Sequence, residues 1–131
     1  MISIQNLDVT LGNKNIVDNL TLNIEKGKFI SIIGPNGCGK STLIKAISGV
    51  HKITSGSIKI NGKNRNQMNR KDLSKKLAFL MQFNNTSEDI TAQEIVAFGR
   101  YPHVKAFHGM SKKDYEIIDW AIDKTNIRQL K

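Results

Sequence analysis

The sequence has 131 residues, 39% of them hydrophobic and 24% charged, which indicates one globular domain and argues against disorder. No apolar run approaches the length of a membrane span, and the single cysteine cannot form an internal disulfide, so a reducing, cytoplasmic setting fits. The net charge of +9 would suit nucleic acid or an anionic membrane face. Because the basic residues are not interleaved with stacking aromatics, we favour solvated basic faces instead.

The chain opens with strand patterns. Residues 2–9 alternate loosely between apolar and polar side chains and predict an edge strand. Residues 16–24 predict a second strand, after a turn at 12–15. Residues 28–33, Lys-Phe-Ile-Ser-Ile-Ile, are rich in β-branched residues and predict a short buried strand.

A glycine-rich stretch follows directly. Residues 34–42, Gly-Pro-Asn-Gly-Cys-Gly-Lys-Ser-Thr, fit the phosphate-loop pattern Gly-x-x-x-x-Gly-Lys-[Ser/Thr], and a helix with Leu43, Ile44 and Ile47 on one face should follow. Glycines let successive backbone N–H groups point at a phosphate, and a helix start adds partial positive charge. The alternative is a plain glycine turn ahead of a helix.

Each side chain of the loop has an expected role. Lys40 should reach the β- and γ-phosphates, and the Ser41 hydroxyl should ligate Mg²⁺. Thr42 can add a donor near the α-phosphate. The predicted nucleotide-binding set is Gly34, Asn36, Gly37, Cys38, Gly39, Lys40, Ser41 and Thr42.

Beyond the loop the pattern continues to alternate. We expect a helix ending near Gly49, a turn at 54–57, a strand at 58–60 stopped by Asn61-Gly62, a polar surface loop at 63–70, a short basic helix at 71–76 and a buried strand at 77–81. A basic cluster is expected to be solvated: Arg65, Arg70, Lys71, Lys75 and Lys76.

The last third of the chain carries no strand signal. Two capping boxes, Thr91 with Glu94 and Ser111 with Asp114, each predict a helix start. The second helix should bury a face formed by Tyr115, Ile118 and Ile122, widened by Trp120 and Ala121. We therefore expect an α/β nucleotide-binding core at residues 1–82, joined near Gln82 to an incomplete helical subdomain at residues 83–131.

At this point the sequence resembles the amino-terminal half of an ABC transporter ATPase. Within that family it is similar to the importers of ferric siderophores, haem and cobalamin, most specifically through the Gly-Arg-Tyr-Pro-His run that begins at Gly99. The resemblance spans the chain from Ile2 to about Leu130 and depends on residues 19–28, 34–43, 54–58, 61–62, Gln82 and 90–103.

The resemblance implies a P-loop NTPase (RecA-like) α/β core with N-terminal antiparallel strands, followed by the start of a helical subdomain, in a truncated chain. It implies ATP and Mg²⁺ as cofactors, with Ser41 and Gln82 at the metal and Gln82 also sensing the attacking water. The implied partners are transmembrane permease subunits, contacted through the Q-loop around Gln82, a second ATPase subunit in a homodimer and, indirectly, a substrate-binding protein. The implied location is the inner face of the cell membrane, in the cytoplasm.

The sequence also departs from the family. Leu11 stands where the family stacks adenine on an aromatic residue, so only a weaker apolar contact is expected there. The signature Leu-Ser-Gly-Gly-Gln, the catalytic glutamate after an acidic strand end and the switch histidine are absent, and no residue can be assigned as the general base. Taken alone, the polypeptide should therefore bind nucleotide poorly and hydrolyse it negligibly.

The resemblance further implies that the phosphate-loop strand lies between strands of the later half, so open sheet edges and marginal stability are expected. Two alternatives to a transport ATPase stay open: a nucleic-acid-associated P-loop ATPase, which the charge of +9 would suit, and an inert nucleotide-binding fragment.

Overall fold

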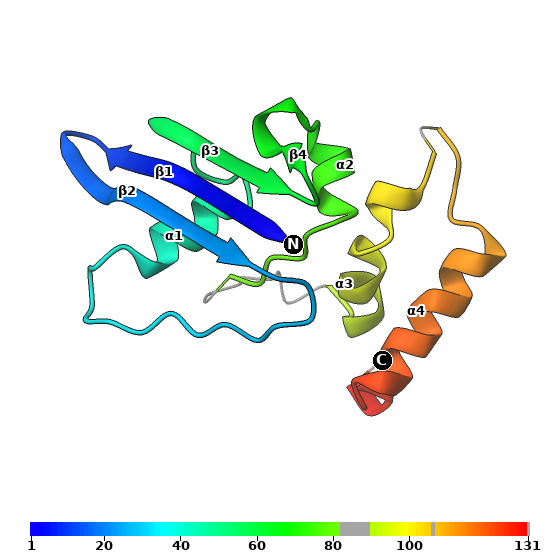
Figure 1. Cartoon of the computed structure of the whole chain (residues 1–131). Coiled ribbons are helices and arrows are strands. Elements are labelled where there is room, and N and C mark those ends of the chain that lie inside the picture. The colour runs from blue at the N-terminus through cyan, green and yellow to red at the C-terminus, as the bar shows by residue number, and fades with distance from the viewer. Residues whose placement is uncertain (82–89, 106, 131) are drawn as a thin grey trace. The chain divides into compact units, whose positions relative to one another are not determined.

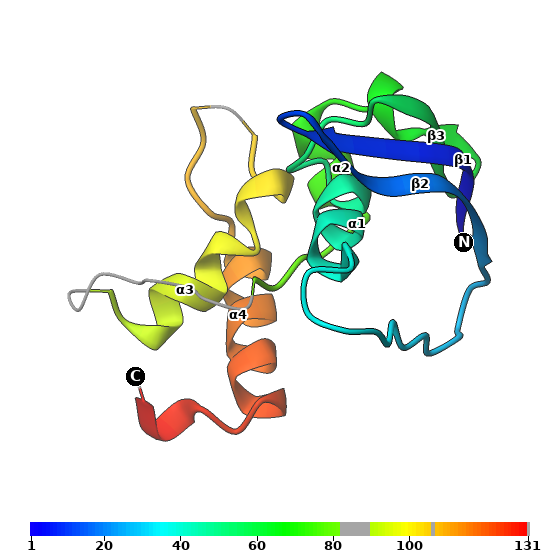
Figure 2. The same ribbon diagram turned by 90° about the vertical axis from the view of Figure 1, so that its left-hand side faces the viewer.

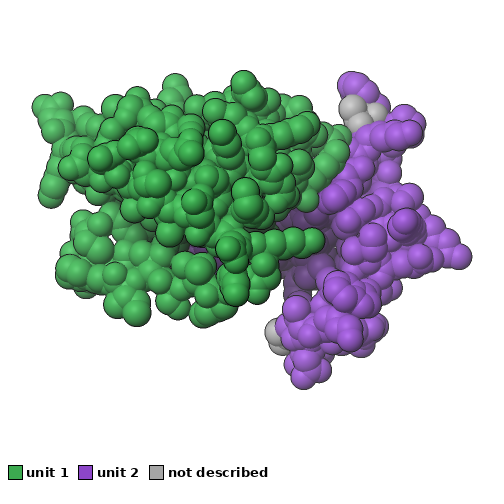
Figure 3. Space-filling model, in the orientation of Figure 1, with its two compact units in different colours: residues 1–79 green, residues 80–131 purple. Residues whose placement is uncertain are grey.

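The computed structural model describes residues 1–81, 90–105 and 107–130 of the chain (Figure 1). It divides into two compact units, Met1–Phe79 and Leu80–Lys131, coloured green and purple in Figure 3. We describe each unit by itself. Gln82, where the sequence analysis places the domain boundary, lies outside the described residues, so the predicted assignment of roles to residues 1–82 and 83–131 stays a prediction.

The first unit contains a four-stranded antiparallel sheet with the strand order β2-β1-β3-β4. The strands are β1 (Ile2–Leu11), β2 (Lys14–Ile24), β3 (Ser55–Ile60) and β4 (Lys63–Asn64). The two strands predicted at 2–9 and 16–24 therefore exist, but β1 is an interior strand and the prediction of an edge strand was wrong. Local alternation cannot show that β3, from far along the chain, pairs with the free side of β1.

A β-bulge replaces the turn predicted at 54–57. Residues 55–57 belong to β3, and the register against β1 shifts between Gln5 and Asp8. Gly56 has φ +79°, and a Cβ there would lie 2.2 Å from the carbonyl oxygen of Asn6. Glycine at this position thus serves close backbone approach within the sheet, not chain reversal. The Asn61-Gly62 turn is confirmed, with φ values of +49° and +80° that suit the hairpin joining β3 to β4.

Helix α1 (Lys40–Ile47) lies against one face of the sheet and contacts β1 and β2 (Figures 1 and 2). Leu43 and Ile47 of the predicted helix face are buried, whereas Ile44 is 41% exposed and Ala46 is buried beside them. The core between the helix and the sheet is formed by Ile4, Leu7, Val9, Val17, Leu43, Ala46, Ile47, Ile58 and Ile60.

Two predicted buried strands are not formed. Residues 28–33 and 77–81 are irregular, and side chains that should be buried are exposed, Phe29 by 94%, Ile33 by 92% and Leu80 by 85%. The physical reason is that a buried parallel strand exists only with strands on both sides to accept and donate its backbone hydrogen bonds. Among the described residues none pairs with these two segments, although their composition favours strands.

The segment predicted as a polar surface loop at 63–70 is more ordered than expected, since it forms β4 and the short 3₁₀ helix η1 (Arg65–Gln67). The short basic helix predicted at 71–76 is confirmed as α2 (Arg70–Ser74), whose start is capped by Asn69 accepting a hydrogen bond from the N–H of Asp72 at 2.8 Å. Arg65 is only 8% exposed, so its assignment to a solvated cluster was wrong. The cluster's other members, Arg70, Lys71, Lys75 and Lys76, are exposed as expected.

The second unit is helical. Its elements are α3 (Ala92–Phe98), η2 (Tyr101–His103), α4 (Lys112–Lys124) and η3 (Arg128–Leu130), and α3 contacts α4. Both predicted capping boxes are present, Thr91 with Glu94 and Ser111 with Asp114.

The buried face of α4 differs from the one predicted. Ile118 and Ile122 are buried as expected, but Tyr115 and Trp120 are 53% and 61% exposed, and Asp114 is buried instead. Sequence spacing alone placed the aromatic residues on this face, whereas the helix turns a carboxylate inward to meet Arg100. No helix that the structure describes combines the length and the apolar character needed to cross a membrane.

Candidate functional site

The phosphate-loop residues 34–39 form an irregular turn that leads into α1 (Figure 1). Gly37 and Gly39 have φ values of +80° and +94°, a backbone conformation that residues with a side chain rarely adopt. A Cβ on Gly39 would also lie 2.8 Å from the carbonyl oxygen of Ile16 on β2, and a Cβ on Gly34 would lie 2.8 Å from the Cys38 Sγ. The loop can therefore take this path only with glycine at these positions.

The ammonium of Lys40 lies within the loop. Its Nζ donates hydrogen bonds to the carbonyl oxygens of Gly34 at 2.7 Å and Pro35 at 2.6 Å, and lies 3.7 Å from the Cys38 Sγ. The loop thus surrounds the positive charge of Lys40, which is the first residue of α1. Both acceptors lie in an exposed segment, so an anion could approach the same ammonium from solvent.

The start of α1 is suited to an anion. Its N-cap is Gly39, which has no side chain to cap the helix, and the first turn contains no acidic residue. The first helical hydrogen bond runs from the N–H of Leu43 to the carbonyl oxygen of Gly39 at 2.9 Å. The backbone N–H groups of Lys40, Ser41 and Thr42 precede it and have no acceptor four residues earlier in the helix. Unpaired amides, the helix dipole and an ammonium converge here, as a polyphosphate requires.

Ser41 is exposed in the first turn of α1, next to Lys40. A hydroxyl oxygen is the kind of hard ligand that Mg²⁺ prefers, so the residue fits the predicted metal role. The loop, the ammonium and the hydroxyl that the sequence predicted are therefore brought together at one helix end. Asn36 and Cys38 lie in the same exposed loop.

Two other predicted participants belong to segments outside the loop and α1. Gln82, predicted to sense the metal and the water, lies outside the described residues. Leu11, at the expected adenine-stacking position, is the last residue of β1 and is 40% exposed.

Sequence reasoning missed one contributor to the loop. Ile16 of β2 abuts Gly39 with both its carbonyl oxygen and its side chain, at 2.8 Å and 3.2 Å from a Cβ placed there. No motif could have found it, because the contact is made by backbone from another strand and any residue could supply the carbonyl.

The chain is similar to known proteins. The family model described as ABC transporter matches residues 17–131. The chain is 37% identical over 128 residues to the iron(3+)-hydroxamate import ATP-binding protein FhuC of Bacillus subtilis, covering 98% of this chain and 48% of that protein. It is 37% identical over 126 residues to the ferric enterobactin transport ATP-binding protein FepC of Escherichia coli, covering 96% and 46%.

Solved structures are similar to this chain in fold. A dimeric structure of the ATP-binding cassette MJ0796 bound to ADP and Pi superposes with a TM-score of 0.74 at 29% identity, covering all of this chain and 58% of that one. A second dimeric structure of the same cassette gives a TM-score of 0.76, also at 29% identity and with the same coverage. The chain spans about half the length of the curated relatives it matches. With a family match over most of its residues, the chain belongs to the ABC transporter family and is a partial ATPase domain of that family, whose members bind ATP.

Proposed function

We propose that residues 34–42 and the start of α1 bind the phosphates of ATP, and that the chain is the nucleotide-binding part of an ATPase that powers an importer. The observation that carries the proposal is the Lys40 ammonium held at the open, uncapped end of α1. Lys40 would meet the β- and γ-phosphates, and the amides at the helix start would meet the remaining phosphate oxygens. The glycines would keep side chains out of the way.

Mg²⁺, when bound, would neutralise negative charge on the phosphates. Ser41 would supply a hydroxyl ligand from the first turn of α1. Gln82 would supply a second ligand and sense the attacking water, because an amide can both donate and accept without titrating.

The transported compound is proposed from the relatives. Similar proteins are named for iron(3+)-hydroxamate import, petrobactin import and ferric enterobactin transport, and another is named as part of a probable siderophore transport system. We therefore propose an iron–siderophore or related metal complex as the cargo. The partners would be membrane permease subunits, contacted near Gln82, and a second ATPase subunit, at the inner face of the membrane; a substrate-binding protein would take part indirectly.

Titration of the full chain with Mg-ATP tests nucleotide binding. Lys40→Met removes the ammonium, and we expect the dissociation constant to rise by about tenfold or more, because a charge-assisted contact to phosphate is lost. Lys45→Met is the matched control, since it removes the same charge from the last turn of the same helix, away from the loop. Wild-type protein that fails to bind, or a Lys40→Met variant that binds like Lys45→Met, would exclude this site.

The net charge of +9 favours one second candidate, a P-loop ATPase that acts on nucleic acid. Binding of duplex DNA that weakens steeply with salt would support it. Capture of a hydrophobic permease by the same chain would support transport.

A further inference from the structure

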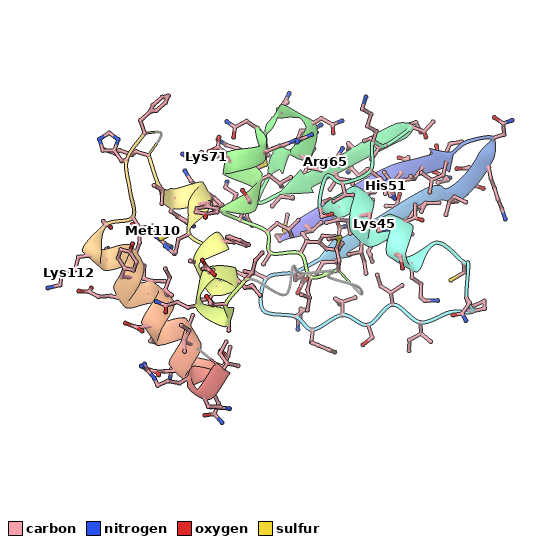
Figure 4. The ribbon with its side chains drawn as sticks, turned by 180° about the vertical axis from the view of Figure 1, so that it is seen from behind. Lys45, His51, Arg65, Lys71, Met110 and Lys112 are labelled. Atoms are coloured by element: carbon pink, nitrogen blue, oxygen red, sulfur yellow. The ribbon has the colours of Figure 1, made fainter. Side chains whose placement is uncertain are left out.

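Arg65 is a buried cation near the far end of the phosphate-binding helix. It is 8% exposed and begins η1 directly after the β3–β4 hairpin. The backbone around it is fixed, because the Asn64 side chain caps η1 by accepting from the N–H of Asn66 at 3.0 Å. Figure 4 labels Arg65 together with Lys45 and His51, close to the C-terminal end of α1.

Among the described residues, the guanidinium of Arg65 donates to neutral oxygens. One Nη donates to the carbonyl of Ala46 at 2.5 Å and to that of His51 at 3.2 Å, and the other donates to the Asn66 Oδ1 at 2.5 Å. In the part of the chain that the structure describes, no carboxylate forms an ion pair with it. Burial lowers the pKa of Arg65 from its ordinary value, yet a guanidinium stays charged near neutrality.

These contacts add to backbone hydrogen bonds that already close the helix end. The carbonyl of Ala46 also accepts from the N–H of Gly49 at 3.2 Å and that of Ile44 from the N–H of Ser48 at 2.9 Å, and the partial negative charge at this end of α1 favours a cation beside it. Ala46 belongs to α1 and His51 follows the turn after it, so one guanidinium joins the two sides of that turn. The N–H of His51 also donates to the carbonyl of Lys45 at 3.0 Å.

The turn after α1 approaches α2 at Gly49. Gly49 has φ +82°, and a Cβ there would lie 3.0 Å from the Leu73 side chain and 4.0 Å from the Arg65 guanidinium. The end is therefore bounded by α2 on one side and held by hydrogen bonds from η1 on the other. Because α1 has only 8 residues and is rigid, its N-terminal end moves with the C-terminal end that Arg65 holds.

We propose that Arg65 is a positioning residue for nucleotide binding, which fixes α1 at its C-terminal end so that Lys40, Ser41 and the free amides keep their places at the other. The inference rests on the proposed function for its consequence, since it assigns phosphate binding to the start of α1. It adds a residue outside the glycine-rich loop to those on which the site depends.

The test compares variants of this chain by titration with Mg-ATP. Arg65→Met keeps the length of the side chain but removes all donors, and we expect the dissociation constant to rise by about tenfold. Arg65→Lys keeps the charge and can reach one carbonyl, so it should recover part of the affinity. Ile60→Ala in β3 is the control for general damage to the same core. It should lower the unfolding temperature while the folded protein binds nucleotide as the wild type does. The proposal would be overturned if Arg65→Met bound Mg-ATP as tightly as the wild type does. It would also be overturned if Ile60→Ala lost as much affinity for Mg-ATP as Arg65→Met.

Amide hydrogen exchange gives a second measurement that needs no nucleotide. Arg65→Met should speed exchange by about tenfold at the end of α1, including the N–H of Ser48 that donates to Ile44, and leave the β1 amides unchanged. If wild-type protein does not bind Mg-ATP, the proposed function fails while this measurement still decides the role of Arg65. If Arg65→Met does not fold, the same exchange comparison is made with Arg65→Lys, and unchanged α1 exchange in that variant would contradict the role.

Discussion

Asp114, the third residue of α4, links two helices through one carboxylate. Its Oδ2 accepts hydrogen bonds from the backbone N–H and the hydroxyl of Ser111, at 2.9 Å and 2.6 Å. Its Oδ1 accepts from the Nε and Nη2 of Arg100, at 2.9 Å and 2.7 Å. These hydrogen bonds, from Ser111 first and then from Arg100, lower the pKa of Asp114 to about 2. The start of α4 is thereby tied to the residue that follows Gly99 at the end of α3.

Replacing Asp114 with Asn should lower the stability of the α3–α4 unit in a pH-dependent way. A carboxylate with a lowered folded-state pKa contributes stability above its unfolded-state pKa, about 4, and loses it as the pH falls through about 2. The difference in unfolding temperature between wild type and Asp114→Asn should therefore be full at neutral pH and shrink between about pH 4 and pH 2. Glu116→Gln, an exposed change on the same helix, is the control. A difference that stays constant across this range would contradict the assignment.

At the scale of elements, the features that were predictable from the sequence have local causes. The two capping boxes and the Asn61-Gly62 turn each depend on residues within four positions of one another, and all three are formed. The phosphate loop was predictable for the same reason, since its glycines, Lys40 and Ser41 are contiguous in the sequence. Neither the Ile16 carbonyl against Gly39 nor the Arg65 contact with α1 could be found, because both join segments far apart in the chain.

The strands predicted at 28–33 and 77–81 failed for a related reason. Hydrophobic, β-branched composition shows that a segment suits a buried sheet, but a strand also needs partners for its backbone groups. The prediction for β1 was wrong in the opposite sense, because it assigned too few partners to the strand. The second partner, β3, comes more than forty residues later in the sequence and makes β1 an interior strand.

The β-bulge where β1 pairs with β3 gives a prediction at this scale. Gly56→Ala should destabilise the first unit by about 2 kcal/mol or more, because alanine would be strained at φ +79° and its Cβ would lie 2.2 Å from the Asn6 carbonyl oxygen. Gly62→Ala is the matched control, since φ is +80° but nothing lies within 4 Å of the added Cβ. It should cost about 1 kcal/mol, from strain alone. Chemical denaturation of both variants measures the difference, and equal costs would show that the contact with β1 is unimportant.

At the scale of the whole molecule, the exposed apolar segments set the behaviour in solution. Phe29 and Ile33 lie in an extended segment whose backbone pairs with no described strand, and they are 94% and 92% exposed. Extended, apolar and unpaired backbone is a template for association with another chain. We expect the purified chain to self-associate as its concentration rises.

Light scattering and size-exclusion chromatography over a range of concentrations test this expectation. Phe29→Lys combined with Ile33→Lys should reduce self-association without lowering the unfolding temperature, because neither side chain is buried in the fold. Trp120→Lys is the control, since Trp120 is 61% exposed on α4, where the backbone is already hydrogen-bonded within the helix. A clean monomer at all concentrations, or an equal effect of the Trp120 change, would refute edge pairing as the cause.

The interior position of β1 has a consequence for synthesis on the ribosome. Once β2 has emerged, β1 can pair with it at once, because the two are neighbours in sequence, through contacts such as Ile2 with Ile24. Its other side must wait for β3, where Ile2 meets Ile60, by which time α1 and the phosphate loop have also been translated. The nascent two-stranded ribbon is marginally stable by itself. While the nucleotide-binding segment is being made, the edge of β1 that later pairs with β3 therefore exposes unpaired backbone groups, which are prone to aggregation. Slowing translation between β2 and β3 should lengthen this vulnerable interval and increase the need for chaperones.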